Sequence, residues 1–344
     1  MNDRDKRLRA LVIAPTFFGY EAQIVDEFER QGFETTFIDE RPSNSTISRA
    51  LLRARKDFVN RQIDRYYRRR LTEIGGDLFD VVFVVRAEAT PRWFLENLRQ
   101  SNPSANFVFY IWDAISKATN CLDVFDLFDQ RFSFDPADVA EYPELSYLPL
   151  FYTPDFAPLP EFEAISRPRR FTLSFIGTLH PGRYSYVQKL FANRPRTFKY
   201  FFVQARWYFI VVKYLTREHN NVPWSDVSFK KLTRQQVAEV FRESGAVLDM
   251  PQPNQCGLTI RTFEVLASGS ILVTTNPYIV HEPFFDSGRV IVVPDGTEQA
   301  ALGELQERFD SMIPPVGAPE SFDQYSLASW VRAIVTARSA GAVE

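Results

Sequence analysis

Short apolar runs alternate with amphipathic segments along most of the chain. Residues 8–18 form an apolar, partly β-branched run that ends at Gly19, and residues 21–32 carry apolar side chains at helical spacing up to Gly32. The same alternation predicts strands over residues 33–39, 79–87, 106–114 and 131–135, with helices over 47–74, 91–101 and 136–142. Continuously apolar strands separated by helices indicate a parallel sheet covered on both faces, with its ligand site beyond the carboxyl ends of the strands.

Residues 148–170 are rich in proline and interrupt this alternation, which favours a linker between two domains. A second series follows, with predicted strands over residues 171–178, 197–205, 245–250, 270–276 and 289–295, and with predicted helices over 185–193, 234–244, the segment before residue 270, and 321–339. We therefore expect an α/β protein of two Rossmann-like domains whose parallel sheets face each other across a cleft. The expected boundaries are 1–155 for the N-terminal domain, 156–320 for the C-terminal domain, and 321–344 for a C-terminal helix packing back toward the N-terminal domain.

The composition of the chain narrows the classes of function. Of 344 residues, 45% are hydrophobic and 24% charged, as in a folded globular protein. The formal net charge is −3, so the charge of the chain as a whole does not favour binding to nucleic acid. Two cysteines, Cys121 and Cys256, are too few and too far apart for a disulfide framework or a zinc site. No apolar stretch approaches the roughly 20 residues that cross a bilayer, and the start lacks the features of a signal peptide. We therefore expect a cytoplasmic protein.

The segment before residue 270 carries the most specific chemistry. At about 100° per residue, Arg261 and Glu264 share one narrow stripe of a helix that is otherwise mostly apolar. Gly257 and Thr259 leave the first backbone amides unobstructed, which suits a phosphate held by free N–H groups and the positive end of the helix dipole. Arg261 can add a charge-assisted bond to that phosphate, and Glu264 can accept bonds from a ribose diol one turn along. The alternative is that this stripe is only the solvent-facing side of the helix.

This segment resembles the donor-site signature of group 1 glycosyltransferases of the GT-B fold, especially the branch of the spore maturation protein CgeB. The family pattern is Gly-Leu, a short spacer, Arg-Thr-Phe-Glu, and then Ala-x-Gly before an apolar strand, and residues 257–269 match it. The resemblance implies that Glu264 binds the nucleotide ribose and that Arg261 and Thr259 meet the diphosphate. The best-known GT-B pattern has another glutamate where this chain has Cys256, which leaves open whether the anomeric configuration of the sugar is retained.

Residues 173–190 resemble the first strand and turn of the C-terminal domain in the same family, where a turn of small residues approaches the donor phosphates and an arginine follows. Taken alone, a Gly-Thr pair after a strand is more often only a tight turn. Paired with the previous motif, it supports a donor site. The resemblance as a whole implies donor-binding roles for Gly177, Thr178, Arg183, Gly257, Leu258, Thr259, Arg261, Thr262 and Glu264.

Glycosyl transfer also calls for a general base in some enzymes, and we expect it at the strand ends of the N-terminal domain. Asp113 and Glu88 occupy such positions and are the candidate catalytic residues, although each serves equally well as a helix cap or an ion-pair partner. The resemblance implies no metal in the active site. The sequence agrees, because its three histidines, His180, His219 and His281, are scattered and no acidic cluster has the spacing of a cation site.

The sequence thus predicts a glycosyltransferase that moves a sugar from a nucleotide-sugar donor to a saccharide or lipid-linked saccharide of a bacterial surface glycan such as lipopolysaccharide or capsule. The nucleotide sugar is a co-substrate, and no further cofactor is expected. A non-catalytic sugar-nucleotide-binding protein is the alternative. The basic residues of the helix over 47–74 fit a solvated face and peripheral contact with an anionic membrane equally well. The aromatic and basic residues 196–218 raise the same alternative, and here a buried strand and helix are expected instead of membrane contact.

Overall fold

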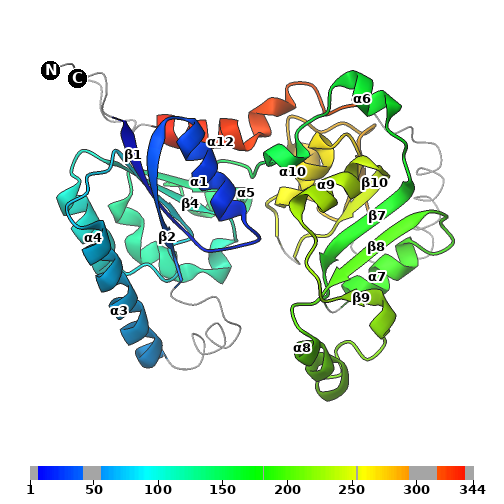
Figure 1. Ribbon diagram of the computed structural model, residues 1–344, viewed down its shortest axis with the longest axis horizontal. Coiled ribbons are helices and arrows are strands. Elements are labelled where there is room, and N and C mark those ends of the chain that lie inside the picture. Colours follow the sequence, from blue (N-terminus) through cyan, green and yellow to red (C-terminus); the bar gives the residue numbers. More distant parts are fainter. Residues whose placement is uncertain (1–6, 42–55, 181, 253–254, 294–315, 338–344) are drawn as a thin grey trace. The chain divides into compact units, whose positions relative to one another are not determined.

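The computed structural model describes residues 7–41, 56–180, 182–252, 255–293 and 316–337 of the chain. It divides the chain into two compact units, Met1–Leu150 together with Leu327–Glu344, and Phe151–Ser326. Each unit is built on one six-stranded parallel sheet with helices packed against it, shown in Figure 1. The predicted α/β fold of two Rossmann-like domains is confirmed, while residues 47–55 of the predicted basic helix lie outside the described residues.

The sheet of the first unit has the order β2-β1-β3-β4-β5-β6, and all its pairs are parallel. Its strands are β1 (Leu8–Ala14), β2 (Phe33–Asp39), β3 (Val81–Val85), β4 (Asn106–Ile111), β5 (Gln130–Ser133) and β6 (Ser146–Tyr147). Its helices are α1 (Tyr20–Arg30), α3 (Lys56–Ile74), α4 (Arg92–Ser101), α5 (Pro136–Glu141) and α12 (Leu327–Thr336), with the 3-10 turns η1 (Ile115–Lys117) and η2 (Thr119–Leu127). The first strand is shorter than predicted and ends at Ala14, so residues 15–18 form a loop.

Alternating side chains of the central strands fill two apolar layers. On β3, Val82 and Val84 belong to a core that includes Phe94 of α4. Phe83, which points to the other face, contacts Phe28 of α1 and Trp330 of α12, with ring centroids 5.9 and 5.7 Å apart. Because both faces of β3 are covered, all five of its residues are buried, as its unbroken apolar sequence predicts.

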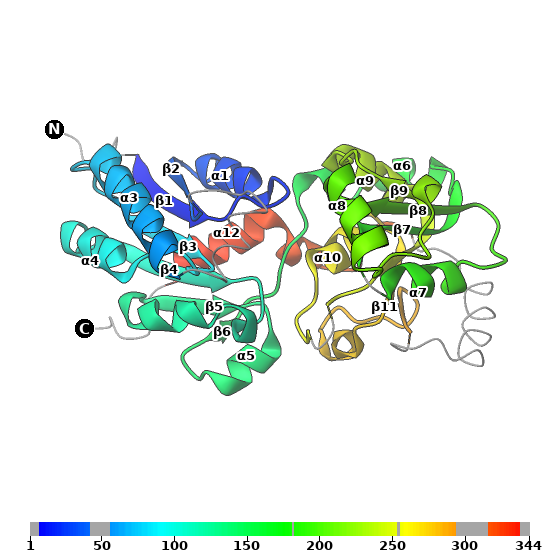
Figure 2. The same cartoon turned by 90° about the horizontal axis from the view of Figure 1, so that it is seen from below.

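The sheet of the second unit has the order β12-β11-β10-β7-β8-β9 and is also parallel throughout. Its strands are β7 (Phe171–Thr178), β8 (Thr197–Phe202), β9 (Val227–Ser228), β10 (Ser244–Asp249), β11 (Ile271–Thr274) and β12 (Val290–Val292). Its helices are α6 (Glu161–Ser166), α7 (Arg183–Leu190), α8 (Arg206–Ile210), α9 (Arg234–Arg242) and α10 (Ile260–Ala267), with the π-helical turn η4 (Val211–Leu215) after α8 and the 3-10 turns η3 (Pro154–Phe156), η5 (Trp224–Asp226), η6 (Pro277–His281) and η7 (Phe322–Tyr325). Figure 2 shows α7 and α8 with this sheet from a second direction.

One prediction about the second unit is wrong. Residues 206–215 were expected to be part of a buried strand and helix, but α8 and η4 expose Trp207, Tyr214 and Leu215 by 58%, 58% and 74%. Apolar composition normally indicates burial, and here only Phe209 and Val212 of this segment are buried.

Candidate functional site

The amino end of α10 lies at the place where the strand order of the second sheet reverses. β7 comes first in the chain of this unit, β8 lies on one side of it and β10 on the other, so the loops after β7 and β10 leave neighbouring strand ends in diverging directions. Ligands of open parallel sheets bind at such switch points, beyond the carboxyl ends of the strands. The two motifs found in the sequence, after β7 and after β10, therefore come together at one end of the sheet.

Buried Asp249, the last residue of β10, anchors the start of α10. Its Oδ2 accepts hydrogen bonds from the hydroxyl groups of Thr259 at 2.6 Å and of Thr262 at 3.1 Å. Thr259 is the N-cap residue, with extended backbone angles, and its side chain does not cap the first turn because it is bound to Asp249 instead. The first turn of α10 is thus held by its side chains while its amino end carries no side-chain cap, which suits an anionic ligand.

Two guanidinium groups beside this helix end lie near enough for their charges to interact. Arg183, at the start of α7, donates to the carbonyl oxygens of Thr178 and Met250, at 3.1 and 2.9 Å. Burial is the main cause that lowers the pKa of Arg183 to about 10, and the positive charge of Arg261 contributes to that shift. The Nε atom of Arg261 is itself buried and has no hydrogen-bond partner among the described residues. Two partly buried like charges repel each other unless an anion lies between them, so a negatively charged ligand would stabilise this pair.

The loop before α10 is fixed by Asn276, which follows β11. The buried Asn276 amide donates to the carbonyl oxygens of Cys256 and Gly257, at 3.0 and 3.3 Å. Gly257 is buried, and Leu258 is only 3% exposed. Leu258 therefore anchors the loop in the apolar interior rather than facing a ligand, while Cys256 is partly exposed.

The packing inside the second unit requires a glycine at position 177. A Cβ atom at this position would lie 2.7 Å from the ring of Phe175, which is only 1% exposed and cannot move aside easily. Thr178 ends β7 and provides the carbonyl that holds Arg183. The small residue is thus required by the interior of the strand, whatever ligand approaches the turn.

Glu264 and Thr262 face the interior of the second unit. Glu264 is 3% exposed and Thr262 1%, so the alternative that this stripe of α10 is a solvent-facing side does not hold for the glutamate. A buried carboxylate needs hydrogen-bond or charge partners, because desolvation is costly.

The chain leaves the end of α10 through Gly269, whose φ of +73° lies in the left-handed region that glycine adopts easily.

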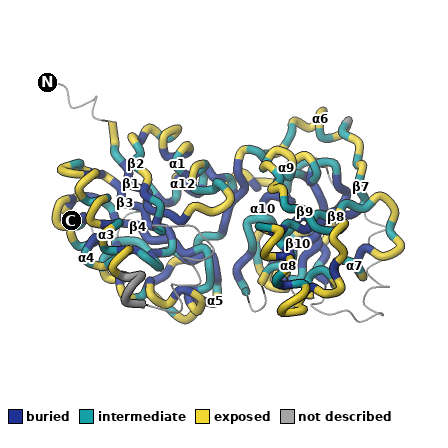
Figure 3. Tube along the Cα trace, turned by 60° about the horizontal axis from the view of Figure 1, so that its bottom comes forward, coloured by how far each residue is buried: buried dark blue, intermediate teal, exposed yellow. Residues whose placement is uncertain are grey.

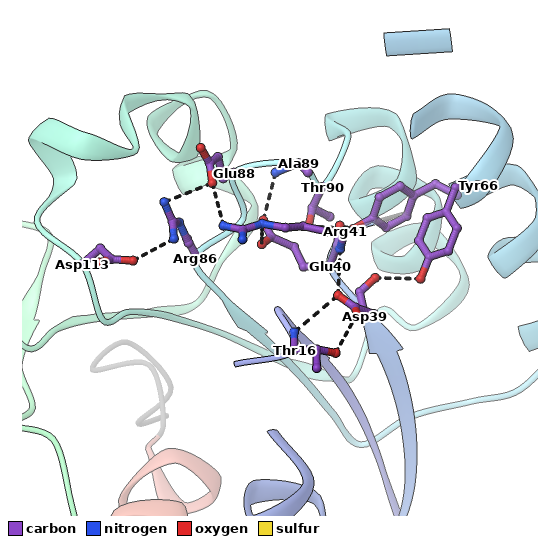
Figure 4. A network of polar contacts seen from close by, with 11 residues as sticks. Thr16, Asp39, Glu40, Arg41, Tyr66, Arg86, Glu88, Ala89, Thr90 and Asp113 are labelled. Carbon is purple, nitrogen blue, oxygen red and sulfur yellow. Dashed lines mark hydrogen bonds and ion pairs between the residues drawn. The ribbon is translucent and has the colours of Figure 1, made fainter. Parts of the chain in front are cut away.

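The first unit gathers a separate polar network at the carboxyl ends of its strands, shown in Figure 4. Asp113 and Glu88, the two candidate bases from the sequence, both form ion pairs with Arg86. Its guanidinium binds Asp113 after β4 at 2.8 Å and Glu88 at 3.1 Å, and Glu88 also binds Arg41 after β2 at 3.0 Å. Burial raises the pKa of Asp113, and the charge of Arg86 opposes that rise.

Backbone strain accompanies this network. Arg86 and Ala87, neither of them glycine, have φ angles of +77° and +51°. Such conformations cost on the order of 1 kcal/mol each and persist only where the surroundings hold them, most often at functional sites. Here the ion pairs of Arg86 and the hydrogen bond from its backbone N–H to the carbonyl of Tyr110, at 2.8 Å, fix the turn.

A fully buried carboxyl, Glu40, lies below the arginines. Its Oε1 accepts a hydrogen bond from the backbone N–H of Ala89 at 2.9 Å, and its Oε2 has no hydrogen-bond partner among the described residues. Burial is the main cause that raises the pKa of Glu40 to about 7. Tyr67 of α3 fixes the same segment by donating to the backbone carbonyl of Glu40 at 2.8 Å.

Sequence reasoning missed several residues of both sites. Asp249 ends β10 and Asn276 follows β11, so both look like ordinary turn residues in the sequence. Only the folded sheet shows that they support the loop and first turn of α10. Arg86 stands beside Glu88 in the sequence, so an ion-pair role was within reach, but its contact with Asp113 depends on the pairing of β3 with β4. Among the described residues, no group of histidine, cysteine or acidic side chains has the arrangement of a metal site. No described helix is both long and apolar enough to span a bilayer.

Comparisons with known proteins were informative for one segment of the sequence and for the fold of the whole chain. Residues 203–308, which include α10, match the model of a family described as glycosyl transferase-like. No curated protein sequence matches the chain. Three similar solved structures are the sucrose-phosphate synthase of Thermosynechococcus elongatus, HepE of Anabaena in complex with UDP-glucose, and a UDP-forming α,α-trehalose-phosphate synthase of Burkholderia xenovorans in complex with glucose-6-phosphate.

Their sequence identities to this chain are 11%, 10% and 13%, and their TM-scores are 0.58, 0.56 and 0.62. The alignments cover 97%, 95% and 94% of this chain, and 95%, 98% and 98% of the three neighbours. At such identities the likeness establishes the fold, which is GT-B. Residues 203–308 are therefore similar to a glycosyl transferase-like family and lie within a GT-B fold, and the family match supports a glycosyltransferase as the enzyme class.

Proposed function

We propose that the protein transfers a sugar from a nucleotide-sugar donor to a hydroxyl group of a bacterial surface glycan or glycolipid, without a metal in the active site. The observation that carries the donor assignment is that Arg183, bound to the carbonyl of Met250, and Arg261 repel each other electrostatically beside the amino end of α10. Two cations and a helix dipole stabilise the negative charge that develops on a departing diphosphate, which is the work that a metal ion does elsewhere. Glu264, one turn along α10, is the proposed partner of the ribose.

The donor assignment has a direct test. HepE was solved with UDP-glucose and the Burkholderia enzyme is UDP-forming, so UDP-sugars are the first donors to try in a panel of nucleotides and sugar nucleotides. We expect at least one of them to raise the melting temperature, because a ligand that binds only the folded state stabilises it by mass action. Glu264→Ala should reduce that shift while the protein stays folded by circular dichroism. If calorimetry gave Glu264→Ala the same donor affinity as the wild type, the ribose assignment would be wrong.

Asp113 is the proposed general base. Among the described residues it is ion-paired with Arg86 alone, whereas a single oxygen of Glu88 is bound by both Arg86 and Arg41, which makes Glu88 a bridge between two arginines. A base that lies at a strand end, and whose pKa burial raises, suits proton abstraction near neutral pH. The acceptor class rests on the family resemblance of the sequence. A nucleotide-sugar donor implies reaction in the cytoplasm, at the inner face of the membrane if the acceptor is lipid-linked.

A non-catalytic sugar-nucleotide-binding protein is the second candidate, because the ion pair with Arg86 ties up the carboxyl that would act as base. Asp113→Asn separates the two. In an enzyme it should lower release of UDP from the best donor by about 10²- to 10⁴-fold with donor affinity unchanged. Glu88→Gln, the matched control, should have the smaller effect. Wild-type protein that binds the donor yet shows neither transfer nor hydrolysis would favour the binding protein.

A further inference from the structure

The segment Arg206–Leu215, formed by α8 and η4 and called the aromatic helix below, is apolar on the side that it turns away from its own unit. Trp207, Ile210 and Tyr214 recur at intervals of three and four residues, so they lie along one face of the helix. They are 58%, 45% and 58% exposed. Phe209 and Val212 take the opposite side and are buried in the core of the second unit.

This exposure is concentrated rather than scattered. Beside that face, Tyr208 is 42% and Leu215 74% exposed, and Trp224 of η5, 40% exposed, packs edge-on against Phe209 with ring centroids 4.8 Å apart. Figure 1 shows α8 extending from the end of the second unit where β9 lies, and Figure 3 shows the same segment mainly in the colour of exposed residues. Single exposed apolar residues are ordinary on a protein surface, but a contiguous group of this kind marks an interaction surface.

The charge of the aromatic helix identifies the partner. From Arg206 to Glu218 the sequence holds three basic residues, Arg206, Lys213 and Arg217, and one acidic residue, Glu218, at its end. Lys213 lies over the rings of Phe209 and Tyr214, at 5.9 and 5.7 Å from their centroids, and its Nζ donates to the carbonyl oxygens of Asn220 and Val222, so its positive charge is fixed beside the helix. Positive charge beside tryptophan and tyrosine, whose rings are apolar and whose tips are polar, is typical of residues at the interface of an anionic membrane.

A second copy of this chain is a poorer partner. A twofold contact through the aromatic helix would bring the basic residues of both copies into one interface, and like charges within an interface are costly. The basic helix α3 is also a poorer membrane surface. In the described part of α3 the large apolar side chains face the core, as Ile63 and Tyr67 do, and Arg69 and Arg70 are paired with Glu73.

We propose that the aromatic helix docks the second unit on an anionic lipid bilayer, with Trp207, Ile210 and Tyr214 inserted among the headgroups. The surface belongs to the donor-binding unit and its residues are absent from the donor site, so the proposal stands apart from the proposed function. It is compatible with a lipid-linked acceptor but does not require one.

The test is sedimentation with vesicles of three parts phosphatidylcholine and one part phosphatidylglycerol, against vesicles of phosphatidylcholine alone. The wild type should bind the anionic vesicles, and more weakly at high salt, because ionic screening weakens attraction between surface charges. The affinity of the triple variant Trp207→Ser/Ile210→Ser/Tyr214→Ser for these vesicles should be lower by a factor of about ten or more. The control Ile165→Ser, on α6 and 64% exposed in the wild type, should bind as the wild type does.

Circular dichroism and the thermal shift with UDP show whether the triple variant is folded and has kept its donor site. Its side chains are exposed, so both readings should match the wild type. The proposal is overturned if the wild type does not bind anionic vesicles, or if the folded triple variant binds them equally well. It is also overturned if light scattering shows that the wild type is a dimer and the triple variant a monomer. A failure of UDP to shift either protein would count against the proposed donor site alone and would leave the vesicle result intact.

Discussion

At the scale of single residues, the second unit keeps two arginines near enough for their charges to interact beside the amino end of a helix. Arg183 gains partners from backbone carbonyls, whereas the buried Nε of Arg261 lacks one among the described residues. The ligand-free protein therefore carries an electrostatic cost at this position, which binding of a diphosphate would remove. Residues selected for binding rather than for stability often show this signature.

Arg261→Met should therefore change stability and binding in opposite directions. Without ligand, the variant should be as stable as the wild type or more so, because a like charge beside Arg183 is gone. Its affinity for UDP should fall by about 10- to 100-fold, the value of one charge-assisted bond. Calorimetry with UDP and thermal melts without it check the two halves. Arg170→Met, at an exposed residue near the start of β7 in the same unit, is the matched control and should leave UDP affinity unchanged.

Glu40 gives the first unit a pH dependence. Its folded-state pKa of about 7 lies above its ordinary value of 4.5, so the folded state binds the proton more tightly than the unfolded chain does. The stability from this group is fully present below about pH 4.5 and is lost as the pH rises through about 7, a change of about 3 kcal/mol. Glu40→Gln should remove this component, so urea unfolding from pH 5 to pH 8 should show a smaller decline for the variant. Equal slopes for both proteins would rule out this role.

At the scale of elements, the sequence predicts best what local pattern determines. The unbroken apolar run of β3 and the motif of α10 are both readable, because burial on two faces and a helix start are local properties. The residues that hold the site in place cannot be predicted from local sequence pattern. Asp249 precedes Thr259 by ten residues, and their contact exists only because the chain turns back at the end of β10. The aromatic helix was misjudged for a different reason, since apolar content alone does not say whether a partner lies outside the chain.

α10 depends on Asp249 in a way that can be measured. Asp249→Ala leaves the hydroxyl groups of Thr259 and Thr262 without their acceptor, at a cost of about 1–3 kcal/mol for each buried polar group left unpaired. The melting temperature should fall, and donor binding should weaken because the first turn of α10 loses its anchor. Thr259→Val, which removes one of the two hydroxyl groups together with its bond, should have the smaller effect on stability. A stable Asp249→Ala variant with normal UDP affinity would contradict this account.

At the scale of the whole molecule, the two units differ in how the chain supplies them. The second unit is continuous, and its two ends meet, since Tyr152 and Ser326 form a parallel bridge and the N–H of Tyr152 donates to the carbonyl of Tyr325 at 2.9 Å. The first unit is discontinuous, because α12 joins it after the second unit is complete. Trp330 of α12 packs on Tyr110 of β4, with ring centroids 4.8 Å apart, and is 2% exposed.

Residues 151–326 should therefore fold alone and bind UDP, whereas residues 1–150 should not reach a stable fold. Removal of α12 uncovers Phe83 and Tyr110, whose rings contact Trp330. Loss of a large buried aromatic side chain by itself costs about 3–5 kcal/mol, a large fraction of the stability of a domain. Separate expression of the two fragments, followed by circular dichroism and a UDP thermal shift, checks both halves. A cooperative thermal transition in fragment 1–150 would show that α12 is dispensable.

The late arrival of α12 also reverses the order in which the two units can finish during synthesis. The segment that leaves the ribosome earlier has to wait, with one face of its central strands covered by α1 but not yet by α12, until α12 has emerged. The later segment meets no such delay, because every strand of its sheet is already available. The nascent first half is therefore the part that a chaperone has most reason to shield, and a stop codon shortly before Trp330 would harm the half of the protein that was translated long before it.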